Sequence, residues 1–335
     1  MGAAHGRRSI GTGRGAFKGG TGQFRAPGRV RLLGVGVALV MAACSPPDRP
    51  PALADPLPRA VGELLHPDTV RSERVGAGVW YRYLWSSKGP WAVYAVEADA
   101  TRCDLTLRVL QAEPRESGGR GHERVTSMVA RSNGRVLAAV NADFFTPEGG
   151  ALGTEVVDGR VTSARERPAL AWRRGQNPWM GIVDVEDDSL HAGWTLALHD
   201  PDGADSATEI VGGYPELLDS GRRVGDLEVT ERPSFAAARN PRTAVGFDAS
   251  SRRLWLLVVD GRQAPYSVGM TLPELADLLQ AFGATDAINL DGGGSSVIVV
   301  GGRALNHPSD ATGERAVVNA LALVRDFAGC RRSAR

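Results

Sequence analysis

Short segments with the composition of β-strands dominate the chain from about residue 74, and they constrain the fold more than any other feature. The segments VWYRYLW, WAVYAVEAD, LTLRVLQAE and VLAAVNADFF are rich in β-branched and aromatic residues and are bounded by Gly, Pro or Asp. Asp158-Gly159 separates two short apolar segments, which predicts a two-residue hairpin. A second hairpin is expected to turn near Ser250-Ser251. No period repeats along the chain, so neither a propeller nor a solenoid is indicated.

Two helices are predicted among these strands. The first, ERVTSMVARSN, places Val125 and Met128 on one face. The second, TLPELADLLQAFG, has the capping-box residues Thr271 and Glu274 at its start and Gly283 at its end. Because strands outnumber helices and the helices are scattered, the predicted class is α+β. We expect one strand-rich domain over residues 74–330, with antiparallel or mixed sheets.

The first 43 residues differ in charge from the rest of the chain. They contain seven Arg or Lys and no Asp or Glu, so without them the formal net charge of +1 becomes −6. A mildly acidic body gives no electrostatic case for a nucleic-acid partner. Arg29 and Arg31 precede an apolar stretch that ends at Ala43, too short to span a bilayer and typical of a signal-peptide core. Residues 1–43 are therefore predicted to be an N-terminal arm and signal peptide.

Cys44 directly follows two alanines, an arrangement that resembles a bacterial lipobox. The resemblance implies cleavage before Cys44 and lipidation of this residue; a plain secretory signal is the alternative. Residues 44–73 begin with a proline-rich stretch and are predicted to be a tether. The expected location is extracytoplasmic, anchored by lipid to a membrane of the cell envelope. In an oxidising compartment, Cys103 and Cys330 are either one disulfide or two unrelated buried thiols.

An Asn-x-Asp pair ends two of the apolar strands. Asn141 and Asp143 lie in AAVNADFF, and Asn289 and Asp291 lie in DAINLDGGG. Because side chains alternate along a strand, the two members of each pair share one face. Burying such pairs without partners is costly, so we expect both pairs to face one polar cleft. The alternative is that they bind backbone groups at strand ends.

Three consecutive glycines, Gly292, Gly293 and Gly294, follow the second pair. Residues without a Cβ can turn several backbone N–H groups toward one anion, and Ser295 adds a hydroxyl donor. No lysine follows as it does in a P-loop, so a nucleotide site is not indicated. A tight hairpin turn is the alternative for this segment.

Six segments of the chain together resemble the phosphodiester glycosidase family over residues 125–325. In chain order they are NADFF, GGYPELLDSG, ARNPRTAVGFD, VVDGR, TLPELADLLQAFGATDAINLDGGGSS and GERAVVNALAL. The resemblance implies hydrolysis of the glycosidic C–O bond of a sugar-1-phosphate diester, such as an N-acetylglucosamine-1-phosphodiester. The implied substrates are carbohydrates or glycan phosphates of a wall polymer, glycan or glycolipid, including exopolysaccharide.

The implied reaction needs two carboxyl groups beside the glycosidic bond and cationic donors on the phosphate. Asp291 is the first candidate carboxylate, Glu314 the second and Asp143 the third. Arg242 and Arg262 are the candidate phosphate ligands. The other predicted substrate contacts are Asn141, Phe144, Thr243, Asp260, Asn289, Gly292, Gly293, Gly294, Ser295, Arg315 and Asn319.

No cofactor is required by this chemistry, and no metal site is predicted. The histidines lack metal-ligand spacing, while the acidic segments DVEDD and HDPDGADS leave calcium as an option. Two other functions remain open. One is a non-catalytic lipoprotein that binds or exports surface polysaccharide, and the other is a phosphodiesterase of the same fold that cleaves the P–O bond.

Overall fold

The structure is a computed structural model that describes residues 56–116, 118–173, 175–186, 195–198, 208–328 and 330. The predicted signal peptide, Cys44 and the first part of the predicted tether lie outside the described residues. So does most of the two acidic segments considered for calcium.

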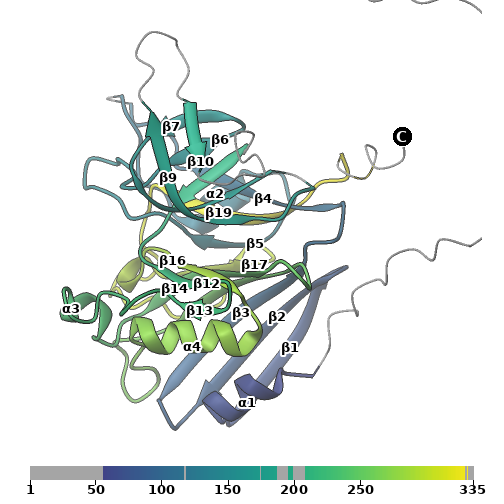
Figure 1. Cartoon of the computed structure of the whole chain (residues 1–335), viewed down its shortest axis with the longest axis vertical. Coiled ribbons are helices and arrows are strands. Elements are labelled where there is room, and N and C mark those ends of the chain that lie inside the picture. Colours follow the sequence, from purple (N-terminus) through teal and green to yellow (C-terminus); the bar gives the residue numbers. More distant parts are fainter. Residues whose placement is uncertain are drawn as a thin grey trace, which may run out of the picture. The chain divides into compact units, whose positions relative to one another are not determined.

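Three sheets form the described fold, and every strand pair within them is antiparallel (Figure 1). The largest sheet contains, in spatial order, β1 (Thr69–Gly76), β2 (Val79–Ser86), β3 (Trp91–Asp99), β15 (Arg253–Val259), β14 (Arg242–Asp248), β16 (Asp286–Asn289), β12 (Glu216–Asp219) and β13 (Arg222–Arg223). A five-stranded sheet contains β18 (Arg303–Ala304), β17 (Ile298–Val300), β5 (Val136–Asn141), β19 (Asn319–Arg325) and β4 (Leu105–Gln111). A six-stranded sheet contains β10 (Thr195–Leu198), β9 (Trp179–Glu186), β8 (Arg167–Trp172), β11 (Glu209–Gly212), β6 (Glu155–Val157) and β7 (Arg160–Ser163).

The main hydrophobic core lies between the eight-stranded and the five-stranded sheets. Val140 and Ala142 reach it from the β5 side, and Ile288 and Leu290 reach it from the β16 side. These are the residues that alternate with the two Asn-x-Asp pairs. The apolar positions of the two strands therefore bury as the period-two pattern predicts, and the polar positions face away from this core.

The described residues contain four α-helices. The helices α1 (Arg59–Leu65) and α4 (Leu272–Phe282) pack on the outer face of the eight-stranded sheet (Figure 1). The helix α2 (Val125–Ala130) packs on the outer face of the five-stranded sheet, and α3 (Pro233–Ala236) is a single turn. Among the described residues, no helix has the length and apolar character needed to cross a membrane.

Local sequence signals account for several of these elements. Thr271 accepts a hydrogen bond from Glu274 N, and Thr271 N donates to the Glu274 carboxylate, so the predicted capping box is confirmed. Gly283 ends α4 in the left-handed conformation, with φ 107°. The hairpin at Asp158-Gly159 joins β6 to β7, and the hairpin near Ser250-Ser251 joins β14 to β15.

The predicted tether of residues 44–73 extends too far toward the C-terminus. The helix α1 already begins at Arg59, where Val61 and Leu65 are fully buried beneath α4. The strand β1 begins at Thr69 and pairs with β2 along its length. The proline-rich composition before residue 59 obscured a short helix whose apolar residues complete the core.

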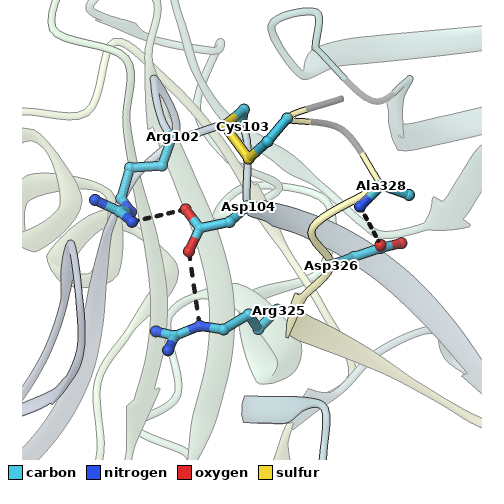
Figure 2. The surroundings of a disulfide bond; sticks show 7 residues. Arg102, Cys103, Asp104, Arg325, Asp326 and Ala328 are labelled. Atoms are coloured by element: carbon cyan, nitrogen blue, oxygen red, sulfur yellow. Dashed lines mark hydrogen bonds and ion pairs between the residues drawn. A yellow bond between two sulfur atoms is a disulfide. The ribbon is translucent and has the colours of Figure 1, made fainter. Parts of the chain in front are cut away.

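Cys103 and Cys330 form a disulfide with a Cα–Cα distance of 4.8 Å. Figure 2 shows Asp104 next to it, between the guanidinium groups of Arg102 and Arg325, at 2.8 and 3.7 Å. The bond ties the residues after β19 to the turn before β4. Of the two alternatives left by the sequence, the structure has the disulfide.

Replacing both cysteines by serine is expected to lower the free energy of unfolding by about 2–5 kcal/mol, because the cross-link restricts the unfolded chain. Chemical denaturation of the double variant and of the parent chain under oxidising conditions measures this difference. Turnover by the folded double variant is expected to match that of the parent chain, since no site residue contacts the bond. An unchanged denaturation midpoint would contradict the expectation.

Candidate active site

The two Asn-x-Asp strand ends meet, although β5 and β16 belong to different sheets. Asp291 N donates to Ala142 O at 2.8 Å, and Asn141 Nδ2 donates to Asp291 O at 2.6 Å. These two bonds place the residues after β5 beside the residues after β16. The two strand ends therefore lie together, while the polar cleft that both pairs are expected to face stays a prediction.

The asparagines of these pairs hold the backbone instead of facing a ligand. Asn141 is fully buried, and its Oδ1 accepts hydrogen bonds from Thr243 Oγ1 at 2.8 Å and Val297 N at 3.1 Å. Asn289 is also buried, and its Nδ2 donates to Tyr214 O at 2.7 Å. The predicted substrate contacts of Asn141, Asn289 and Thr243 are corrected on this ground. For the asparagines, the alternative of backbone binding at strand ends is the one observed.

Asp291 is partly exposed beside the glycine segment. Burial raises the pKa of its carboxyl group to about 6, against the opposing effects of a Ser295 hydrogen bond, the Arg315 charge and Gly292 N–H. A carboxyl group with this environment changes charge close to neutral pH. It can therefore act as a carboxylate at pH 7 while retaining a high affinity for a proton.

Asp143 is almost completely buried, with 2% of its surface exposed. Its Oδ2 accepts a hydrogen bond from Gly153 N at 2.8 Å. Burial raises the pKa of Asp143 to about 7; the Gly153 N–H opposes this rise and the nearby Glu155 charge adds to it. The two aspartates thus have raised pKa values, and that of Asp143 is the higher.

The glycine segment does not form the predicted cradle of N–H groups. Residues 293–295 make one turn of 3₁₀ helix, in which Gly293 N donates to Pro241 O at 2.9 Å. Gly292 N–H is directed to the carboxylate of Asp291. Both N–H donors therefore bind groups of the protein itself. The alternative prediction for this segment, a tight hairpin turn, is not observed.

Close packing explains the glycines. Gly293 has a φ of 62°, and a Cβ there would lie 3.2 Å from Arg262 Nη2. A Cβ on Gly294 would overlap with the side chains of Asp310 and Arg315. The absence of side chains lets two guanidinium groups lie against the backbone that follows Asp291.

The two arginines beside this segment are held in place by neighbouring polar groups. Arg262 is exposed, and its Nε and Nη2 donate to Asn240 Oδ1 at 3.2 and 2.9 Å. Arg315 is also exposed and makes a bidentate pair with Asp310 at 2.7 and 2.9 Å, while its Nη1 lies 3.4 Å from Ser295 Oγ. Arg262 and Arg315 flank the glycine segment, and both remain accessible to an anionic ligand.

Arg242, the first predicted phosphate ligand, has a different role. Its guanidinium group is buried and donates to the backbone carbonyl groups of Met270, Phe235 and Ala238, at 2.9, 2.7 and 3.0 Å. Burial, followed by the charge of Arg262, lowers its pKa to about 10. Arg242 therefore fastens the segment around α3, and the carbonyl group of Met270 that also accepts from Asn240 N, to β14.

Glu314, the second candidate carboxylate, binds the start of α2. Its two oxygens accept from Thr126 N at 2.9 Å and from Thr126 Oγ1 at 2.6 Å. A carboxylate at this position satisfies an N–H group that the helix itself leaves unpaired. The structure thus corrects its assignment to the carboxylate pair.

Asn319 and Asp260 also bind protein groups in place of substrate. Asn319 Oδ1 accepts from Asp143 N at 2.9 Å, and its Nδ2 donates to Glu155 at 2.5 Å. The carboxylate of Asp260 accepts from Asn306 Nδ2 at 2.9 Å and from His307 N at 3.0 Å. Both residues are buried, so their predicted substrate contacts are corrected to contacts with protein groups.

Partly buried aromatic rings form a cluster beside the strand ends. Phe144, directly after Asp143, lies edge to face against Phe235 with ring centroids 6.2 Å apart. Phe235 stacks on Tyr214 at 6.3 Å, and Arg232 lies over the Tyr214 ring at 5.4 Å. Sequence reasoning found only Phe144. Tyr214 lies in the segment GGYPELLDSG, which carried a usable signal, whereas no pattern marked Phe235.

In the part of the chain that the structure describes, no group of three or more His, Cys, Asp or Glu side chains is arranged to hold a metal ion. The backbone contact between Ala142 and Asp291 brings the two strand ends together, Arg262 and Arg315 lie beside the glycine segment after Asp291, and the aromatic cluster begins at Phe144. Two carboxyl groups and two accessible cations are suited to the hydrolysis of a charged glycosidic bond.

Comparison with known proteins identifies the family. Residues 134–324, more than half of the chain, match the phosphodiester glycosidase family. The chain belongs to this family. The matched range includes both aspartates and both accessible arginines of the site. Membership of the phosphodiester glycosidases supports a hydrolase.

Two of the matching relatives are N-acetylglucosamine-1-phosphodiester alpha-N-acetylglucosaminidases. The protein from Bos taurus is 31% identical over 231 residues, and that from Mus musculus is 30% identical over 229 residues. Each alignment covers 64% of this chain but only 41% or 42% of the relative. The chain thus spans about two fifths of the length of these phosphodiester glycosidases.

Solved structures of low sequence identity share the fold. A hypothetical protein from Synechocystis has a TM-score of 0.63 at 20% identity, covering 77% of this chain and 64% of that one. The catalytic domain of zebrafish N-acetylglucosamine-1-phosphodiester alpha-N-acetylglucosaminidase, auto-inhibited by its pro-peptide, has a TM-score of 0.55 at 23% identity. The latter match covers 77% of this chain and 83% of that domain. The strand-rich α+β class predicted for this phosphodiester glycosidase is confirmed, with antiparallel pairing throughout the described strands.

Proposed function

We propose that the protein hydrolyses the glycosidic C–O bond of sugar-1-phosphate diesters, with Asp291 and Asp143 as the pair of carboxyl groups. The observation that carries the proposal is the hydrogen bond between Asp291 N and Ala142 O, which joins the strand ends that carry the two aspartates, with Arg262 and Arg315 against the glycine segment that follows Asp291. Relatives named for the hydrolysis of an N-acetylglucosamine-1-phosphodiester support the same substrate class.

We assign the roles from the surroundings of the two aspartates, since Asp291 is partly exposed and Asp143 is almost completely buried. Asp291 is the carboxylate that stabilises or attacks the anomeric carbon as positive charge develops there. Asp143 holds its proton to higher pH and supplies it to the departing phosphate oxygen. Water then adds hydroxide to the anomeric carbon and returns a proton to Asp143. The products are the free sugar and a phosphomonoester on the other alcohol.

Arg262 and Arg315 bind the phosphate oxygens in this proposal. A phosphodiester carries one negative charge, and a guanidinium group matches two of its oxygens with parallel N–H donors. The aromatic cluster of Phe144, Phe235 and Tyr214 provides apolar surface against which a sugar ring packs. Arg315 is shared with Asp310, so substrate phosphate competes with that carboxylate for the guanidinium donors.

Export and lipid anchoring at Cys44 belong to the same proposal. The basic arm, the short apolar segment and the alanines before Cys44 support a lipoprotein that acts on wall polymers, glycans or glycolipids outside the cytoplasm. Radiolabelled palmitate incorporated by the full chain, and lost on replacing Cys44 by serine, would support the anchor. Export without incorporation would instead indicate a plain secretory signal.

Hydrolysis in ¹⁸O-labelled water tests the reaction. We expect turnover of an N-acetylglucosamine-1-phosphodiester with the label in the sugar product, since the proposed bond cleaved is C–O. Label in the phosphate product would show P–O cleavage and overturn the assignment. Binding of the diester without turnover would favour a non-catalytic polysaccharide-binding protein.

Arg262→Ala is expected to lower kcat/KM for the diester about 10- to 100-fold, because the variant loses a charge-assisted hydrogen bond to the phosphate. Its free energy of unfolding should stay close to the parent value because the side chain is exposed. Arg242→Ala is the matched comparison. It removes three hydrogen bonds from a buried guanidinium group to backbone carbonyl groups and should lower the free energy of unfolding by about 2–4 kcal/mol. Steady-state kinetics and chemical denaturation of both variants check this contrast. Equal kinetic effects and equal stability effects in the two variants would refute it.

A further inference from the structure

Glu155, at the start of β6, is a charged side chain that the fold buries completely. Its Oε1 lies 2.5 Å from Arg120 Nη2, and its Oε2 accepts from Arg120 Nη1 at 2.7 Å. Gln111 Nε2 and Thr162 Oγ1 also donate to Oε1, each at 2.5 Å. Removing a carboxylate from water costs several kcal/mol, and a well-packed apolar residue usually gives at least equal stability. Stability alone therefore does not account for a glutamate at this position.

The hydrogen-bond network of Glu155 ends at Asp143. Asn319 joins the two residues, because its Nδ2 donates to Glu155 Oε2 at 2.5 Å while its Oδ1 accepts from Asp143 N at 2.9 Å. An ionised carboxylate can only accept hydrogen bonds, so Glu155 requires the NH₂ end of the Asn319 amide to face it. The oxygen end of the amide then faces Asp143. The orientation of Asn319, and with it the backbone of Asp143, depends on the Glu155 carboxylate.

The segment that carries Glu155 also encloses the carboxyl group of Asp143. Gly153 N donates to Asp143 Oδ2, and a Cβ on Gly153 would lie 2.8 Å from that oxygen. A Cβ on Gly212, in the neighbouring strand β11, would lie 2.7 Å from it. Glycine at both positions leaves the space that this carboxyl group occupies.

Two charged groups act on Asp143 from the elements packed around it. The negative charge of Glu155 raises its pKa, and the positive charge of Arg167 on β8 lowers it. Arg120 forms an ion pair with Glu155 and neutralises its charge. Arg120 and Thr162 also line a cavity of about 640 Å³. The protonation of Asp143 thus depends on a charge balance set by residues that do not touch it.

We propose that Glu155 is a positioning residue for Asp143, acting on its backbone through Asn319 and disfavouring a second negative charge beside its own. The proposal rests on the assignment of Asp143 as the proton donor in the proposed function. Glu155 itself touches neither the reacting atoms nor the phosphate.

The test is a carboxyl ¹³C NMR titration of the full chain labelled at aspartate, in which the Asp143 signal is assigned by its loss in Asp143→Asn. The parent chain should titrate at Asp143 near the midpoint of about pH 7. Glu155→Gln removes the negative charge and should move this midpoint to lower pH, by about 1 to 2 pH units. Arg120→Gln leaves the Glu155 charge uncompensated and should move the midpoint to higher pH. If Glu155→Gln does not fold, the upward movement in Arg120→Gln decides the question.

Two control variants separate this effect from the general loss of a buried group. Glu209→Gln removes another buried glutamate of the same sheet, paired with Arg108 at 2.8 Å, and should leave the Asp143 midpoint unchanged. Thr162→Val removes one hydrogen bond to Glu155 but keeps its charge, so the midpoint should also stay in place. An unmoved midpoint in folded Glu155→Gln or Arg120→Gln would overturn the proposal, as would an equal movement in Glu209→Gln.

The kinetic readout distinguishes this proposal from the proposed function. In Glu155→Gln, the alkaline limb of the kcat profile should move in the same direction as the NMR midpoint, with KM for the diester unchanged. If the parent chain hydrolyses no diester while the midpoints move as expected, the proposed function fails and the positioning role of Glu155 stands. If the diester is hydrolysed and the midpoints do not move, the positioning role fails alone.

Discussion

Asp291→Asn is expected to lower kcat for a sugar-1-phosphate diester by about 10³-fold, because the neutral amide cannot stabilise or attack the anomeric carbon. Folding should be retained, since the bonds of residue 291 to Ala142 and Asn141 use its backbone. The pKa of Asp291 is raised from 3.8 to about 6, so the folded state holds its proton more tightly than the unfolded chain does. Ionisation of Asp291 therefore lowers the free energy of unfolding as pH rises from 3.8 to about 6. The uncharged amide side chain of the variant should not destabilise the fold at pH 7.

Single-turnover kinetics and thermal unfolding of the folded variant measure the two effects of Asp291→Asn. Asp286→Asn is the control, because it changes the aspartate at the start of β16, the strand that leads to Asp291. That variant should retain activity near the parent value. Activity within tenfold of the parent chain in Asp291→Asn would remove Asp291 from the carboxylate pair.

Asp143→Asn is expected to change the pH dependence as well as the rate. In the proposed mechanism the active form has Asp291 ionised and Asp143 protonated, so kcat/KM of the parent chain should peak between about pH 6 and about pH 7. The variant should lose the alkaline limb, because the amide has no proton to lose. The fall in kcat should be about 10²-fold, less than for Asp291→Asn, since phosphate departs readily with little protonation.

A stability measurement gives an independent reading of Asp143. Its pKa is raised from 3.8 to about 7, mainly by burial, so the folded state binds this proton more tightly than the unfolded state. The free energy of unfolding should therefore fall as pH rises from 3.8 to about 7, and this decline should be smaller in Asp143→Asn. An alkaline limb and a pH-dependent stability that both persist unchanged in the variant would contradict the assignment of Asp143 as the acid.

Elements with local signals could be predicted from the sequence. The capping box of α4, the hairpin at Asp158-Gly159 and the alternation along β5 and β16 each depend on residues a few positions apart. The disulfide was one of two open alternatives because spacing says nothing about proximity over 227 residues. The short helix α1 was missed because its few apolar residues form no clear pattern on their own. They are buried only because they pack against α4.

The site was predictable only in part. The two aspartates could be found because polar residues at the ends of apolar strands are unusual on local grounds. The roles of Arg242 and Glu314 could not be found, because they depend on partners that the fold supplies. Glu314 accepts a hydrogen bond from Thr126, which lies 188 positions away in the sequence. No local pattern around either residue predicts this contact. Glu155 was missed for the same reason, since in the sequence it is one glutamate beside an ordinary hairpin.

The position of β19 sets the order in which the site can be built during synthesis. This strand, residues 319–325, lies between β4 and β5, and it carries the Asn319 that binds the backbone of Asp143. Asn319 can therefore bind the backbone of Asp143 only after β19 has been translated. A nascent chain that stops after the glycine segment already contains both aspartates but lacks the strand between β4 and β5. The contact that holds the backbone of Asp143 is thus supplied by the last strand of the described fold.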